Sequence, residues 1–208
     1  MKGRLITLEG GEGAGKSTLR SFLADRIAAR GIELVCVREP GGTVIGEAIR
    51  TILLDPHNTA LHAETELLLM FAARAQLVRE TILPALARGA IVLSDRFSDA
   101  SFAYQGGGRR ICTGRIAELE RWVCGIKPDL SILLDLPVDQ GLARARGRGP
   151  VDRIEHEETA FFERVRATYL ARAAAEPERW RVIDAAQPVA AVLAVLAGTL
   201  DDWFEDSA

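Results

Sequence analysis

The most specific chemical signal in the sequence is a glycine-rich segment that ends in a lysine and two hydroxyl residues. It fits the pattern G-x-x-x-x-G-K-[ST] and reads Gly10, Gly11, Glu12, Gly13, Ala14, Gly15, Lys16, Ser17, Thr18. Glycines let backbone N–H groups turn toward a phosphate, and Lys16 can reach the β- and γ-phosphates of a nucleotide. The Ser17 hydroxyl is of the kind that ligates Mg²⁺. The segment predicts a nucleoside triphosphate site, with an incidental glycine-rich turn as the alternative.

An acid and a base, Asp95 and Arg96, follow a continuous apolar run that is typical of a buried strand. The Asp95 carboxylate could hold Mg²⁺, directly or through water, and the Arg96 guanidinium could clamp a phosphate with two parallel hydrogen bonds. An ordinary ion pair at a strand end is the alternative. The functional interpretation is favoured because both this pair and residues 10–15 follow expected strands, so they would share one edge of a parallel sheet.

A third candidate, Arg38, lies between an expected strand and a tight turn. Pro40, Gly41 and Gly42 follow it closely in the sequence. Their residue types are those that initiate turns, so Arg38 would point at the same edge of the sheet. A structural turn with a solvated arginine is the alternative.

An aromatic ring and a guanidinium occur together on a long helical pattern. Phe71 and Arg74 are three residues apart and therefore share a helix face. The pair could hold a nucleobase by stacking and by hydrogen bonds to its edge. On spacing alone, however, a phenylalanine in an apolar run such as 67–71 is more often a core residue.

Four arginines lie between two helical patterns and are interleaved with glycine and proline: Arg144, Arg146, Arg148 and Arg153. Such a segment is more mobile than a helix surface and could close over a triphosphate as a lid of about 144–153. Its cations would then meet the charge of a transferring phosphoryl group. A solvated basic loop is the alternative.

These candidates require a scaffold of alternating strands and helices. Strands are expected at 4–8, 34–37, 90–94, 130–134 and 182–184, and helices at 17–30, 44–54, 64–88, 113–124, 137–146, 157–176 and 188–204. Segments 10–15, 106–110 and 144–153 are expected to be loops. The alternation predicts a parallel sheet with helices on both faces, whose ligands bind beyond the carboxyl ends of the strands.

Length and composition narrow the class of protein. The chain has 208 residues, which is the size of one domain, and its formal net charge of −3 disfavours a general role in nucleic-acid binding. The spacing of Cys36, Cys112 and Cys124 suits neither a disulfide framework nor a zinc site. We find no targeting segment, and the apolar stretch 188–200 is too short to span a bilayer. We therefore expect a soluble, cytoplasmic protein.

Motifs of other nucleotide-binding classes are missing from the sequence. A small GTPase normally carries DxxG and NKxD, but no DxxG occurs and Asn58 is the only asparagine. A translocating ATPase is usually larger. A kinase for a small acceptor fits better, because it needs a second pocket beside the phosphate loop.

Taken in order, the motifs resemble those of bacterial thymidylate kinases. The resemblance covers nearly the whole chain and rests on LEGGEGAGKST (8–18), REPGGT (38–43), FAARAQ (71–76), DRF (95–97), SFAYQGGGR (101–109) and RARGRGPVDRIE (144–155). It implies one α/β domain over residues 1–208, a P-loop NTPase fold with three α/β/α layers, a parallel five-stranded sheet and a short lid. It also implies a homodimer that transfers the γ-phosphoryl group of MgATP to dTMP, giving dTDP for dTTP biosynthesis.

The resemblance assigns the ATP side of the site. Residues 10–18 would bind ATP, with Lys16 on its phosphates and with Ser17 and Asp95 on Mg²⁺. Arg148 would be the lid arginine on the transferred group, together with Arg146 or Arg153. Gly13 stands where the human-type enzyme has a phosphate-loop arginine, and this arrangement is that of the bacterial type, which relies on lid arginines instead.

The resemblance also assigns the acceptor side. The residues expected to bind dTMP are Glu12, Arg38, Phe71, Arg74, Arg96, Ser101, Tyr104 and Gln105. Glu12 would accept a hydrogen bond from the sugar 3′-OH, and the two arginines Arg38 and Arg96 would grip the phosphate. Phe71 would stack on thymine, and Arg74 would reach its O4 atom.

The remaining acceptor residues lie in the segment that follows DRF. Ser101 and Gln105 would contact the thymine side, and Tyr104 would crowd the 2′ position, which disfavours a ribose.

Two rival functions remain open at this stage. The first is a kinase for a deoxynucleoside or another nucleoside monophosphate, and the presence of two phosphate-directed arginines argues against a deoxynucleoside. The second is a regulator that binds nucleotide without turnover. Intact Lys16, Ser17, Asp95 and Arg148 argue against it, because such proteins usually lose at least one of these groups.

Overall fold

A parallel sheet forms the centre of the computed structural model, which describes residues 2–146 and 152–205. Its strands are β1 (Arg4–Gly10), β2 (Leu34–Arg38), β3 (Ile91–Asp95), β4 (Leu130–Asp135) and β5 (Trp180–Asp184). They lie in the order β2-β3-β1-β4-β5, and every neighbouring pair is parallel. The predicted five-stranded parallel sheet is therefore confirmed, and each expected strand is present with its bounds shifted by no more than two residues.

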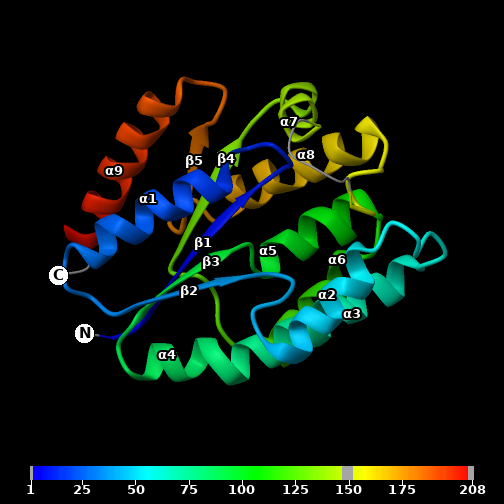
Figure 1. The fold of residues 1–208 in the computed structure, drawn as a ribbon, viewed down its shortest axis with the longest axis horizontal. Helices are drawn as coiled ribbons and strands as arrows, with labels where there is room; N and C mark the ends of the chain where they lie inside the picture. Colours follow the sequence, from blue (N-terminus) through cyan, green and yellow to red (C-terminus); the bar gives the residue numbers. More distant parts are fainter. Residues whose placement is uncertain (1, 147–151, 206–208) are drawn as a thin grey trace.

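Helices connect the strands and cover both faces of the sheet. They are α1 (Lys16–Ala28), α2 (Val44–Leu54), α3 (Ala63–Leu77), α4 (Leu83–Ala87), α5 (Ser98–Ser101), α6 (Thr113–Val123), α7 (Val138–Ala145), α8 (Thr159–Ala175) and α9 (Val189–Glu205), with π-helical segments η1 (Val78–Ile82) and η2 (Phe102–Gly108). Figure 1 shows α1 and α9 on one side of the sheet and α3 and α4 on the other. Among the residues described, no helix is both long and apolar enough to cross a bilayer.

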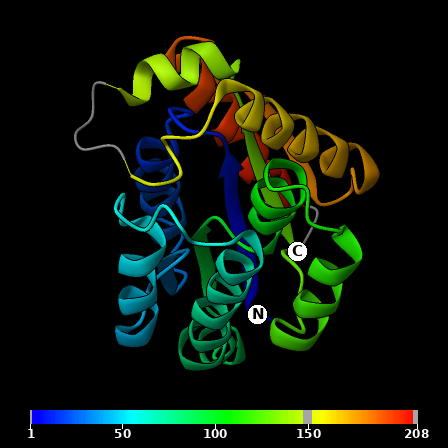
Figure 2. The ribbon, with the colours of Figure 1, turned by 90° about the vertical axis from the view of Figure 1, so that its right-hand side faces the viewer.

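The buried apolar side chains form separate clusters on the two faces of the sheet. Side chains of successive strand residues point to opposite faces, so Leu5 of β1 packs with α3 and α6 while Ile6 packs with α1 and α9. A third apolar cluster joins α8 to η2 and to strands β4 and β5. Because β2, β3 and β1 are neighbouring parallel strands, their carboxyl ends lie side by side at one edge of the sheet. In Figure 2 this edge lies at the top, below α7 and the yellow stretch that begins at residue 152.

The main departure from the expected elements lies after β3. The sequence predicts a loop at 106–110, but residues 106–108 belong to the π-helix Phe102–Gly108, which continues α5 and packs against α8. Gly107 and Gly108 permit this contact. A Cβ at Gly107 would lie 2.9 Å from the Arg164 carbonyl oxygen, and one at Gly108 would overlap the Phe161 ring. The glycines therefore serve close helix packing rather than a flexible loop.

This packing predicts that Gly107→Ala destabilises the protein. The added methyl group would overlap the backbone and the Thr168 side chain of α8, and overpacking of this kind costs about 1–3 kcal/mol. The matched control is Gly198→Ala on α9, where no atom lies within 4 Å of an added Cβ. Thermal unfolding followed by circular dichroism should show a lower Tm for Gly107→Ala and an unchanged or higher Tm for Gly198→Ala. Equal Tm values for the two variants would contradict the close contact.

Candidate active site

A cavity of about 240 Å³ opens at the edge where β1, β2 and β3 end. It brings together most of the residues selected from the sequence: Glu12, Gly13, Ala14, Gly15, Lys16, Ser17, Arg38, Arg74, Asp95, Arg96, Ser101, Tyr104 and Gln105. Gly10, Gly11, Thr18 and Phe71 do not line it. Arg148 lies outside the described residues.

The glycines of residues 10–15 allow the loop between β1 and α1 to curl. Gly10, Gly13 and Gly15 have φ values of 137°, 72° and 92°, a region that residues with side chains rarely adopt. Gly15 caps the N-terminus of α1, whose first residue is Lys16. The Lys16 ammonium donates to the carbonyl oxygens of Gly10 at 3.1 Å and Gly11 at 2.9 Å. The loop thus presents a positive helix end and a positioned ammonium to the cavity.

The environment of Lys16 weakens its hold on its proton. Burial, and next the nearby positive charge of Arg96, lower the pKa of the ammonium to about 8, although the charges of Glu12 and Asp95 oppose this shift. An anion that binds beside Lys16 reverses this effect because it favours the charged form.

Arg96 connects the end of β3 to the phosphate loop. Its guanidinium donates to the Gly10 carbonyl oxygen and to the Glu12 carboxylate, both at 2.9 Å. Its backbone has a φ of 68°, which is unusual for a residue with a side chain. This conformation is held by the Arg96 amide, which donates to the Leu8 carbonyl oxygen, and by the Ser94 hydroxyl, which donates to the Arg96 carbonyl oxygen. Strained backbone of this type is typical of functional sites.

The Glu12 carboxylate receives a second donor. The Tyr104 hydroxyl donates to the same Oε1 atom at 2.9 Å, and the Arg96 guanidinium lies 4.6 Å from the centre of the Tyr104 ring. Glu12, Arg96 and Tyr104 therefore form one hydrogen-bonded unit that links the phosphate loop, β3 and η2.

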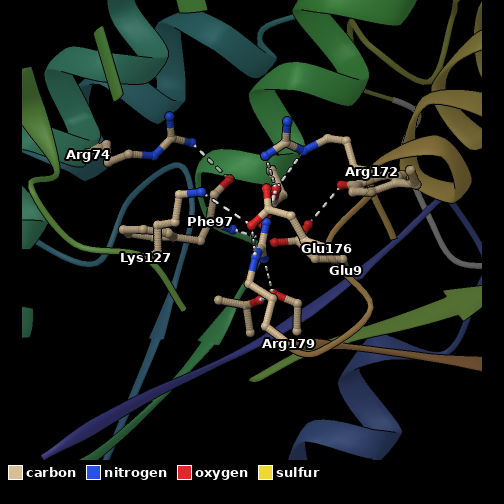
Figure 3. Close-up of polar contacts among 11 residues, drawn as sticks. Glu9, Arg74, Phe97, Lys127, Arg172, Glu176 and Arg179 are labelled. Atoms are coloured by element: carbon tan, nitrogen blue, oxygen red, sulfur yellow. Dashed lines mark hydrogen bonds and ion pairs between the residues drawn. The ribbon is translucent and has the colours of Figure 1, made fainter. Parts of the chain in front are cut away.

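Arg74 lies on the opposite wall and is 2% exposed. Its guanidinium donates to the Glu39 carboxylate at 2.7 Å, to the Ser101 hydroxyl at 3.0 Å and to the Phe97 carbonyl oxygen at 3.1 Å. Figure 3 shows the guanidinium of Arg74 directed at Phe97. The side chain is thus fixed in one orientation before any ligand binds.

The Phe71 ring lies elsewhere than the stacking prediction requires. It is 2% exposed and belongs to the core cluster between the sheet and α3, with the Arg74 guanidinium 4.6 Å from its centre. Met70, its neighbour on α3, lines the cavity instead. The i,i+3 spacing correctly predicts that Phe71 and Arg74 are in contact. Of these two side chains, however, Arg74 lines the cavity and Phe71 packs in the core.

Comparisons with known proteins agree on one family. Residues 8–195 match the family profile described as thymidylate kinase. The thymidylate kinase of Pseudomonas savastanoi pv. phaseolicola is 56% identical over 206 residues, which cover 99% of this chain and 98% of that protein. The chain belongs to the thymidylate kinase family. A crystal structure of thymidylate kinase from Ehrlichia chaffeensis superposes with a TM-score of 0.79 at 30% identity, over 97% of this chain and 99% of that one.

Several residues that the sequence did not single out support the site of this family member. Glu9, fully buried, accepts hydrogen bonds from the Phe97 amide at 2.9 Å and from the Tyr169 hydroxyl at 2.8 Å. Tyr169 in turn accepts from Arg96 at 3.3 Å. Burial, and next the charge of Asp99, raise the pKa of Glu9 to about 8. The available signal was an acidic residue between the expected strand 4–8 and the phosphate loop.

Asp99 joins α5 to α8 and to the segment before β5. This buried carboxylate accepts from Arg172 of α8 at 2.6 Å and from Arg179, which precedes β5, at 2.8 Å. Figure 3 shows the guanidinium groups of Arg172 and Arg179 approaching the same point, from above and from below. Glu176 accepts from Arg179 at 2.8 Å and from Lys127 at 3.2 Å. The network fixes the helix that immediately follows Arg96.

The arginines expected in the lid have different surroundings. Arg144 donates to the Ala185 carbonyl oxygen at 3.1 Å, and Arg146 is exposed at the end of α7. Arg153 is buried, and its guanidinium donates to the Leu53 carbonyl oxygen at 2.8 Å and to the Glu66 carboxylate at 2.6 Å. Arg153 is therefore anchored by these bonds, and Arg146 is the exposed one of the two residues expected to assist Arg148.

The lowered pKa of Lys16 predicts that ATP binding takes up protons in alkaline solution. At pH 8.5 the ammonium, whose pKa is about 8, is mostly deprotonated in the nucleotide-free protein. ATP phosphates raise that pKa, so binding must draw a proton from solution, and less is drawn at pH 7.5 because more of Lys16 is already charged. Calorimetric titrations in buffers of different ionisation enthalpy measure this uptake. Lys16→Met should abolish it, and uptake that does not increase between pH 7.5 and 8.5 would contradict the assignment.

Proposed function

We propose that the chain transfers the γ-phosphoryl group of ATP to dTMP and releases dTDP and ADP, in the biosynthesis of dTTP. The observation that carries this proposal is the composition of one cavity. Its lining joins Lys16 of the phosphate loop to Arg38 and Arg96 at the ends of two neighbouring strands. A kinase that accepts an already phosphorylated substrate needs such cations for both of its anionic ligands.

The phosphate loop binds the donor in this proposal. Backbone N–H groups of residues 10–18 and the Lys16 ammonium hold the ATP phosphates at the N-terminus of α1. Ser17 and Asp95 are oxygen donors in the same cavity, and hard oxygen ligands are those that Mg²⁺ prefers. Ser17 and Asp95 would hold this ion, which when bound neutralises charge on the β- and γ-phosphates.

The acceptor phosphate binds between Arg96 and Arg38. Arg96 is already oriented by the Gly10 carbonyl oxygen and by Glu12. Arg38 pairs with Glu47 at 2.7 Å and is 47% exposed, so it can move toward a ligand. Arg50 also lines the cavity and adds a third cation that the sequence did not single out.

The transfer itself requires no covalent enzyme intermediate. An oxygen of the dTMP phosphate attacks the γ-phosphorus, the bond to the β,γ-bridging oxygen breaks, and ADP departs with that oxygen. Lys16 and Arg96 neutralise part of the negative charge on the transferring phosphoryl group. Arg148 of the lid segment 144–153 is proposed to contribute a further positive charge. Positioning and charge neutralisation therefore account for catalysis.

Residues on the far wall recognise the nucleoside. Arg74 is proposed to donate to thymine O4, with Ser101 and Gln105 beside it. Phe71 stays in the core under Arg74, and Met70 of the same helix lines the cavity at this wall. The Glu12 carboxylate accepts from the sugar 3′-OH, and the Tyr104 ring next to it crowds the 2′ position. The 2.9 Å bond between Tyr104 and Glu12 supports placing both residues at the sugar.

We also propose that the whole chain, residues 1–208, acts as one domain within a cytoplasmic homodimer. Cys36, Cys112 and Cys124 are unbridged, which suits a reducing compartment. An apolar groove between α3 and α6 supports the dimer. Its lining includes Leu68, which is 58% exposed, and Trp122, which is 78% exposed. Large exposed side chains that gather in one patch are typical of interfaces.

An acceptor panel tests the proposed activity. ADP release from MgATP is measured with dTMP, dUMP, UMP, dCMP, AMP, GMP and thymidine. We expect strong turnover with dTMP, weaker turnover with dUMP, and turnover near background with the others. Turnover with thymidine or AMP would retain the kinase but reject the acceptor. A protein that binds ATP but releases no ADP with any acceptor would be a regulator.

The groove between α3 and α6 predicts that Trp122→Glu weakens the dimer. A charge buried at an interface without a partner costs several kcal/mol, so the dissociation constant should rise at least about tenfold. The control is Val195→Glu on α9, whose side chain is also exposed but lies on the other side of the sheet. Light scattering after size-exclusion chromatography, at a series of protein concentrations, measures the fraction of dimer for both variants. Wild-type protein that elutes as a monomer would reject the dimer.

A further inference from the structure

The Glu66 side chain is a buried charged group behind the wall that is proposed to bind the acceptor base. It does not line the cavity itself. It lies on α3 and is 1% exposed. Its Oε1 atom accepts from the Gln105 amide at 2.8 Å and from the Arg109 Nε–H at 3.3 Å. Its Oε2 atom accepts from Arg153 at 2.6 Å and from the same Arg109 Nε–H at 3.2 Å. Neither the sequence motifs nor the reaction described above uses this residue.

The hydrogen bonds of Glu66 keep it ionised at neutral pH. Burial alone would raise the pKa of the carboxyl, but donors from Arg109, Gln105 and Arg153 outweigh burial and lower it below its usual value. An ionised carboxylate can only accept hydrogen bonds. The part of the Gln105 side chain that faces Glu66 must therefore be its NH₂ group.

This contact determines what Gln105 presents to the cavity. Gln105 is 1% exposed and lines the cavity, whereas Glu66 does not. With the NH₂ group turned toward Glu66, the amide carbonyl oxygen is left for the cavity, and no donor among the described residues reaches it. The cavity wall thus offers a hydrogen-bond acceptor at this point, next to the donors of Arg74.

We propose that Glu66 determines base selection by fixing the orientation of the Gln105 amide. The inference rests on the proposed function, in which the acceptor base lies against this wall. A carbonyl oxygen there can accept a hydrogen bond from the N3–H group of thymine. Cytosine has no hydrogen on N3, so the carbonyl oxygen would face a second acceptor. A buried polar group left without its partner is penalised strongly, so one amide orientation can favour thymine over cytosine.

Replacing Glu66 by glutamine should reverse this arrangement. Oε2 lies 2.6 Å from the Arg153 Nη2 and 3.0 Å from the Arg109 Nη2, whereas the only arginine donor to Oε1 among the described residues is the shared Arg109 Nε–H at 3.3 Å. The oxygen of the new amide would therefore stay at the Oε2 position. Its NH₂ group would then take the Oε1 position and face Gln105, which must turn its own oxygen toward that donor. Gln105 would now present an NH₂ group to the cavity. Arg74 bonds to Glu39, Ser101 and Phe97 rather than to Glu66, so its contact with position 4 of the base would be retained.

The test compares the dissociation constants of dTMP and dCMP for wild type and Glu66→Gln. We expect the dCMP-to-dTMP ratio of dissociation constants to fall at least about tenfold, because the expected loss for thymine and gain for cytosine act together. The KM for dTMP should rise while the KM for ATP is unchanged. An unchanged ratio in folded Glu66→Gln would overturn the proposal. Wild type that does not prefer dTMP would instead reject the proposed function.

Three further variants separate orientation from charge and stability. Glu157→Gln removes another carboxylate partner of Arg109 that does not contact Gln105, and it should leave the ratio unchanged. Glu66→Asp still accepts only, so it should keep the ratio even if both affinities fall. If Glu66→Gln does not fold, the charge-balanced double variant Glu66→Gln/Arg109→Gln replaces it, and the same fall in the ratio is expected. A ratio that falls equally in Glu157→Gln would assign the effect to charge and reject the orientation mechanism.

Discussion

The Arg96 guanidinium connects two strand ends, and the geometry of the cavity depends on this connection. β1 and β3 are parallel neighbours, so the phosphate loop after β1 and Arg96 after β3 emerge at the same edge of the sheet. The bonds from Arg96 to the Gly10 carbonyl oxygen and to Glu12 then fix the distance between them. In the proposed reaction this is the distance between donor and acceptor phosphates, and positioning is the main contribution that phosphoryl transfer requires.

Such a connection is possible only because the surrounding charges are paired. Burying an unpaired carboxylate or guanidinium costs several kcal/mol, whereas pairs with additional hydrogen bonds recover much of that cost. The buried acids Glu39, Glu66 and Asp99 each face one or more arginines, and every pair joins elements that are far apart in the sequence. These pairs do more to fix the relative placement of helices than to add stability. The same logic explains why Gln105 and Arg74 are oriented before any nucleotide binds.

Local patterns predicted the sheet, the phosphate loop and most helix bounds, because period and residue type decide those features within a few residues. They failed where the deciding contact is distant. The π-helix η2 was missed because Gly107 and Gly108 are typical of loops, and only packing against α8 explains them. The spacing of Phe71 and Arg74 shows a shared face but not where that face meets the cavity. The partner of Arg153 is Glu66, 87 residues away, and no local pattern contains that information.

The contact between the phosphate loop and α7 limits where catalytic charge can come from. Gly13 has a φ of 72°, and a Cβ added there would lie 2.7 Å from the carbonyl carbon of Gly141. A side chain at position 13, such as an arginine, therefore requires α7 to move and the backbone to accept strain. The loop itself can supply only Lys16 and its N–H groups. Further positive charge must come from outside it, from fixed Arg96 and from the segment that follows α7, which is where the sequence places its interleaved arginines.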